Sequence, residues 1–116
     1  MSGMEALTKL LHWHTIHELA EVVGVSPDTV NSWKQGHTKP QAYALRRIGL
    51  LAAEWPDVTW REVLRALVEK YRLRLIADYL GTNYQTVSTW KNKRADPQPS
   101  NRRRLLELAK EMECDF

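Results

Sequence analysis

The sequence predicts an all-α protein made of two tandem copies of one small helical bundle, with about four helices in each copy. Apolar residues make up 43% of the 116 residues and charged residues 27%, which is typical of a globular chain. Apolar residues recur at helical spacing, and no segment alternates for long enough to predict a strand. The chain also resembles itself when it is shifted by 57 residues.

This internal repeat covers nearly the whole chain. Pairing residues 3–59 with residues 60–116 gives 16 identities in 57 pairs, whereas chance gives only a few. The matches cluster at glycine, tryptophan, proline and apolar positions, as expected for repeated structural units. The sequence therefore predicts one domain over residues 1–56 and a second over 57–116, and their connection is too short to be a flexible tether.

Helix-start and helix-stop signals divide each copy into four segments. Capping-box patterns stand at residues 2–5 and 59–62, and glycines that favour a left-handed cap end the second helices at Gly24 and Gly81. Ser26-Pro27 marks the start of a third helix, and Asn83 has the N-cap place in the second copy. The predicted ranges are 3–13, 16–23, 27–35 and 41–54, followed by 60–71, 73–80, 84–92 and 99–113.

The second and third segments of each copy fit a helix-turn-helix, in which a short helix, a tight turn and a second helix follow one another. Small Ala20 or Ala77 lets the next helix cross closely, and Trp33 or Trp90 is expected in the core. Residues 76–91 closely resemble the phage repressor/Cro-like (Xre-type) DNA-binding family, and residues 19–34 resemble it slightly less. This resemblance implies that the third helix lies in the major groove of double-stranded DNA and that the second helix crosses the backbone.

The same resemblance, carried over by position, implies a set of DNA contacts. Gln85 is the strongest candidate, because a carboxamide can bond to N6 and N7 of adenine together. The implied base contacts are Tyr84, Gln85, Ser88, Thr89, Asp28, Asn31 and Ser32. The implied phosphate contacts are Arg72, Arg74, Lys91, Lys93, Arg94, Thr15, His17 and Lys34.

The charge of the two copies differs. Residues 1–59 have five Lys and Arg against six acidic residues, whereas residues 60–116 have 12 against eight. Because phosphate neutralisation supplies most non-specific affinity, we expect the second copy to bind DNA more strongly. Asp28 would be repelled by phosphate, although it could accept from a cytosine amino group or simply favour the helix dipole. The first copy is therefore expected to read a weaker half-site or to hold a second chain.

Other residues leave structural and functional readings open. Trp13, Trp55 and Trp60 have no aromatic counterpart in the other copy, so they are expected in a contact between copies or chains, or in an ordinary core. The arginines at 102–104 fit either a solvated helix face or phosphate contacts. Lys93 stands where the first copy has Gly36, which puts the geometry of that turn in question.

These observations lead to the expectation of a sequence-specific transcriptional regulator, a repressor of phage or mobile-element type. The alternative is a helix-turn-helix protein-interaction module that binds a polymerase subunit or a toxin. We expect no enzyme activity, cofactor, metal site or small-molecule substrate, since the chain has no phosphate loop, nucleophile elbow or familiar ligand spacing. No signal peptide or membrane span is visible, so the expected location is cytoplasmic and nucleoid-associated.

Overall fold

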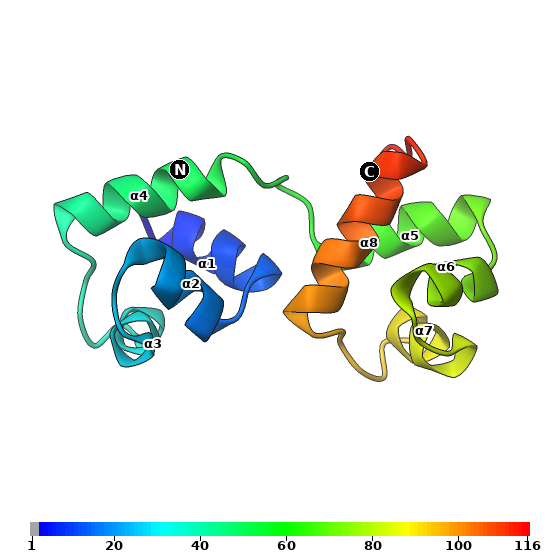
Figure 1. The fold of residues 1–116 in the computed structure, drawn as a ribbon, viewed down its shortest axis with the longest axis horizontal. Helices are drawn as coiled ribbons and strands as arrows, with labels where there is room; N and C mark the ends of the chain where they lie inside the picture. The colour runs from blue at the N-terminus through cyan, green and yellow to red at the C-terminus, as the bar shows by residue number, and fades with distance from the viewer. Residues whose placement is uncertain (1–2) are drawn as a thin grey trace. The chain divides into compact units, whose positions relative to one another are not determined.

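The computed structural model describes residues 3–116, which form eight α-helices and no strand. The protein is therefore all-α, as the sequence predicts. The chain divides into two compact units, Met1–Asp57 and Val58–Phe116 (Figure 1). We call these unit 1 and unit 2. Unit 1 holds helices α1–α4, and unit 2 holds helices α5–α8.

Unit 1 packs its helices around one apolar core. α1 lies against α4, and α2 lies against α3. Leu10, Val30 and Ile48 are almost completely buried, because each falls on the apolar stripe of its own helix. The helices are α1 (Gly3–Trp13), α2 (Ile16–Val23), α3 (Pro27–Gln35) and α4 (Ala42–Ala52).

Unit 2 buries the equivalent positions of the repeat. α5 packs on α8, and α6 packs on both α7 and α8. Leu67, Val87 and Leu105, which lie 57 residues after the three core residues of unit 1, are completely buried. The helices are α5 (Trp60–Lys70), α6 (Leu73–Leu80), α7 (Tyr84–Lys91) and α8 (Pro99–Glu111).

Most of the predicted caps are confirmed. Thr59 forms a capping box with Glu62, and the Asn83 side chain accepts a hydrogen bond of 2.8 Å from the backbone N–H of Thr86. Ser26 caps α3, whose first residue is proline. Gly24 and Gly81 both adopt the left-handed conformation. The capping box predicted at residues 2–5 includes Ser2, which lies outside the described residues.

The third helix ends in the same way in both units, despite the change from glycine to lysine. Gly36 has φ +80° and Lys93 has φ +62°, so the lysine adopts the left-handed conformation that favours glycine. The N–H groups of His37 and Arg94 then donate to the carbonyls of Ser32 and Thr89, each at 3.0 Å. The geometry of this turn is therefore kept in unit 2, at a cost in backbone strain.

Lys93→Gly should consequently stabilise the protein. A side chain in the left-handed region costs about 1–2 kcal/mol, part of which the flexible unfolded glycine returns, so we expect a gain of about 1 kcal/mol. Chemical denaturation measures this directly, with Gly36→Lys as the reciprocal variant that should lose a similar amount. A loss of stability in Lys93→Gly would show that the turn is not strained.

The tryptophans that have no aromatic counterpart in the other copy lie within the core of their own units. Trp13 is completely buried and stacks on Trp55, with ring centroids 5.8 Å apart. Trp60 is 4% exposed, and the guanidinium of Arg61 lies 4.5 Å from its ring centroid. Of the two readings that the sequence left open, the ordinary core therefore accounts for these residues.

Two equivalent arginines bind the end of the second helix. Arg104 donates to the carbonyls of Leu80 and Tyr79, at 2.9 and 2.8 Å. Arg47, its counterpart in unit 1, donates to the carbonyl of Val22 at 2.9 Å. A cation at these carbonyls also complements the negative end of the helix dipole. Both residues thus link the last helix of their unit to its second helix.

Arg102 is also engaged within unit 2. Its Nε donates to the carbonyl of Pro97 at 2.9 Å, and its guanidinium lies 5.9 Å from the ring centroid of Trp60. Desolvation lowers the pKa of this guanidinium, and the charge of Asp96 opposes the shift. The arginine run at 102–104 is therefore more than a solvated helix face.

No helix within residues 3–116 combines the length and the apolar character that crossing a bilayer requires.

Candidate nucleic-acid interface

A capping residue at its start and two buried side chains fix the position of α7 in unit 2. Asn83 fixes its first turn, and Val87 and Trp90 hold it against the rest of unit 2. Ala77 on α6 is 2% exposed and offers no bulk to keep α7 away. α7 is therefore held along its length, with its remaining face open to solvent.

The open face of α7 carries the base-contact candidates of unit 2. Gln85 and Tyr84 are exposed, whereas Ser88 and Thr89 are half-buried. The Thr89 hydroxyl donates to the Gln85 carbonyl at 2.7 Å, and Ser88 accepts from Asn92 at 3.3 Å. Both hydroxyls thus have local partners. Among these residues, the exposed carboxamide of Gln85 has the donor and acceptor pair that reading a base edge requires.

Three of the predicted DNA-contact residues of unit 2 lie together beside α7. Arg72, Tyr84 and Lys91 line the same open hollow, which extends from the end of α5 to the start of α6. The guanidinium of Arg74 lies 5.9 Å from the ring centroid of Tyr84. Tyr84 is thus placed between cationic side chains, an arrangement that suits a phosphate contact as well as a base contact.

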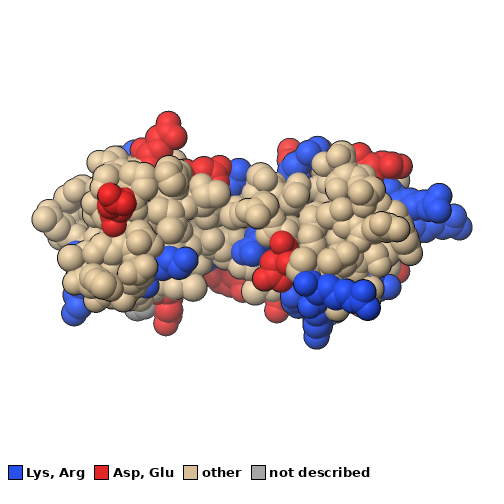
Figure 2. Space-filling model, turned by 90° about the horizontal axis from the view of Figure 1, so that it is seen from below, with Lys and Arg blue, Asp and Glu red and all other residues tan. Residues whose placement is uncertain are grey.

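The remaining cations of this set follow α7. Lys93 and Arg94 stand in the turn that closes the helix, and both are exposed. Figure 2 shows Lys and Arg side chains gathered in groups over unit 2, whereas over unit 1 they stand singly. The difference agrees with the charges of the two units, five Lys and Arg against six acids before residue 58 and 12 against eight after it.

The equivalent residues of unit 1 are less available. The Thr15 hydroxyl accepts from the backbone N–H of Glu18 at 3.1 Å in a capping box, so it already caps α2. The Ser32 hydroxyl lies 2.9 Å from that of Thr38, and Asn31 is half-buried. The exposed candidates of unit 1 are Thr15, His17, Asp28 and Lys34.

Sequence reasoning missed three cations that border this region. Lys70 lines the hollow of Arg72 and Lys91, and Arg61 and Arg65 of α5 lie beside Lys91 and Lys93. The four-residue spacing of Arg61 and Arg65 is a signal for one helix face. This spacing does not predict which neighbouring helix packs beside that face.

Comparison of the chain with family models, curated proteins and solved structures found no match, so the case for a function depends on the residues themselves.

Proposed function

We propose that the protein binds double-stranded DNA in a sequence-specific way, as a transcriptional repressor that occludes a promoter. α7 enters the major groove and α6 crosses the backbone. The observation that carries the proposal is the exposed carboxamide of Gln85 on α7, next in the chain to Tyr84, which lines a hollow together with the cations Arg72 and Lys91. Base-edge and phosphate-binding groups thus occur on and beside one helix, as DNA recognition requires.

Unit 1 has a lesser part in this proposal. Its net charge of −1 contrasts with +4 in unit 2, and hydroxyls at two of its candidate contacts have partners within the unit. Lys34 remains exposed beside α3. We propose that unit 1 reads a weaker half-site or holds a second protein chain.

The experiment that tests sequence specificity is selection from a pool of random duplexes. The full chain should enrich a shared motif, and it should bind that motif at least a thousandfold more tightly than a scrambled duplex of the same length, roughly the lower end for specific DNA binders. Binding without enrichment would leave only a non-specific cationic surface. An absence of binding would favour the protein-interaction module instead.

The two units should respond differently to the loss of one cation. Arg72→Ala and Lys91→Ala should each weaken binding to every duplex alike and lower the salt slope by about one, because each removes one phosphate contact. The matched variant Lys34→Ala, at the position equivalent to Lys91, should change the slope by less. Anisotropy titrations at several salt concentrations measure all three, and equal losses in both units would contradict the asymmetry.

A further inference from the structure

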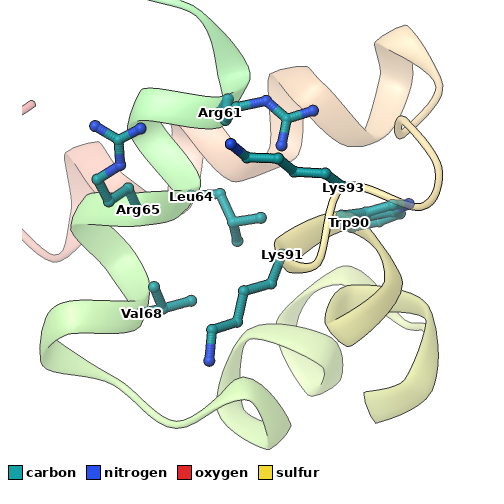
Figure 3. A pocket seen from close by; sticks show the side chains of 7 residues that line it. All are labelled: Arg61, Leu64, Arg65, Val68, Trp90, Lys91 and Lys93. Atoms are coloured by element: carbon teal, nitrogen blue, oxygen red, sulfur yellow. The ribbon is translucent and has the colours of Figure 1, made fainter.

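A second hollow in unit 2 lies between α5 and the end of α7, and its cavity volume is about 160 Å³ (Figure 3). Four cationic side chains line it, two from each side: Arg61 and Arg65 from α5, and Lys91 and Lys93 from α7 and its closing turn. Figure 3 shows that the ends of Arg61 and Lys93 approach each other across the upper part of the hollow. No carboxylate is among its lining residues within the part of the chain that is described.

The wall beneath these cations is apolar. Leu64 and Trp90 are 3% and 4% exposed, and Val68 is half-buried beside them. A site that binds only an inorganic anion or a phosphate gains little from such a surface, whereas an aliphatic side chain gains from leaving water. The hollow therefore combines two kinds of complementarity, to negative charge at its edge and to a small apolar group at its centre.

The apolar wall of this hollow does not face the DNA surface proposed for α7. At 3.6 residues per turn, Gln85 and Trp90 point about 140° apart around the helix axis. A duplex that contacts Gln85 cannot also contact the wall formed by Trp90 and Leu64. The geometry favours a flexible ligand over a stiff duplex.

The repeat shows that this charge is particular to unit 2. The equivalents of Arg61, Arg65 and Lys93 in unit 1 are Met4, Thr8 and Gly36, and none of them is charged. The apolar wall, in contrast, is kept, because Leu7, Leu11 and Trp33 stand at the equivalent positions. One competing contact is present in unit 2, since Arg61 also pairs with the exposed carboxylate of Asp96 at 3.4 Å.

We propose that this hollow binds an acidic segment of a protein partner. Carboxylates of the segment pair with the four cations, and one apolar side chain enters against Leu64, Val68 and Trp90. Exposed ion pairs are individually weak, so the apolar side chain and several carboxylates must act together. This site shares Lys91 and Lys93 with the proposed DNA surface, but its apolar wall and its two arginines lie outside that surface, and the proposal does not depend on DNA binding.

The probe for the test is a labelled synthetic peptide with one central leucine flanked on both sides by aspartate and glutamate. Fluorescence anisotropy of this peptide with the full chain measures its affinity without DNA. The variant Arg61→Met/Arg65→Thr introduces the residues of unit 1, and it should bind the peptide about tenfold more weakly, as expected for the loss of two exposed ion pairs. The same peptide with serine in place of leucine should also bind about tenfold more weakly.

Two further variants separate this effect from folding and from general charge. Lys93→Gly should bind the peptide more weakly while it unfolds at a higher temperature than the parent protein, so unfolding cannot explain its loss. Lys110→Ala removes an exposed cation of α8 and also introduces the residue of unit 1. It should leave peptide binding within about twofold, since distant exposed charges are largely screened by salt.

Three results would overturn the proposal. One is equal affinity of the parent protein and of Arg61→Met/Arg65→Thr for the peptide. The absence of peptide binding by both proteins counts as the same result. Another is equal binding of the leucine and serine peptides, which would reduce the hollow to a patch of charge. The third is a loss of affinity for duplex DNA in Arg61→Met/Arg65→Thr while its affinity for the peptide is unchanged, because the hollow would then contact the DNA backbone.

Discussion

Replacing Trp90 with alanine should destabilise unit 2 by about 3–5 kcal/mol, the range for truncation of a large buried aromatic side chain. Trp90 is 4% exposed and packs from α7 toward α5. Its removal takes away most of the core contact of a helix of eight residues. Such a helix is too short to be stable without tertiary packing.

Denaturation followed by circular dichroism measures this loss, and two variants calibrate it. Trp33→Ala removes the equivalent side chain of unit 1 and should cost a similar amount in that unit. Tyr43→Ala removes an aromatic side chain that is 60% exposed, so it should change stability by less than about 0.5 kcal/mol. Unchanged stability in Trp90→Ala would mean that this ring is exposed in solution and available to stack on bases.

Gln85→Ala should remove sequence preference at one or two base pairs while binding to random duplex remains nearly the same. A carboxamide that bonds to both N6 and N7 of adenine contributes about 1–3 kcal/mol of discrimination. Base contacts specify the sequence, whereas phosphate contacts set the general affinity. The result therefore separates the function of Gln85 from that of Arg72 or Lys91.

The repeat provides the matched variants for this measurement. Asp28 occupies the position of Gln85 in unit 1, so Asp28→Ala should change specificity less. Gln85→Asp should abolish the preference and also weaken binding, because a carboxylate cannot donate to N7 and is repelled by phosphates. Selection from random duplexes, repeated with each variant, reports both effects. Preservation of the motif in Gln85→Ala would contradict the assignment of α7 as the reading helix.

The sequence predicts the helices well because their limits depend on local chemistry. Ser26-Pro27, Asn83 and Thr59 satisfy backbone N–H groups only three residues away, so a short window holds the whole signal. The glycines at 24 and 81 act in the same local way. The last helix of each unit is two or three residues shorter than predicted, since periodicity continues past the residue at which hydrogen bonding ends.

The features that the sequence did not predict depend on distant residues. Arg104 reaches carbonyls 24 and 25 residues earlier, and Trp55 finds Trp13 across 42 residues. The cationic hollow forms only when α5 and the end of α7 are brought together. The left-handed conformation of Lys93 has another cause. The hydrogen bonds of the turn outweigh the preference of a lysine for negative φ.

The salt dependence of binding is the sharpest test of whether unit 2 binds duplex DNA through the cations around α7. Anisotropy of a labelled random duplex, titrated with the full chain over a range of salt concentrations, gives the affinity at each salt concentration. We expect the logarithm of the binding constant to fall linearly with the logarithm of the salt concentration, with a slope of several units, because several counterions are released. An absence of binding at the lowest salt concentration, or an affinity that does not change with salt, would contradict it.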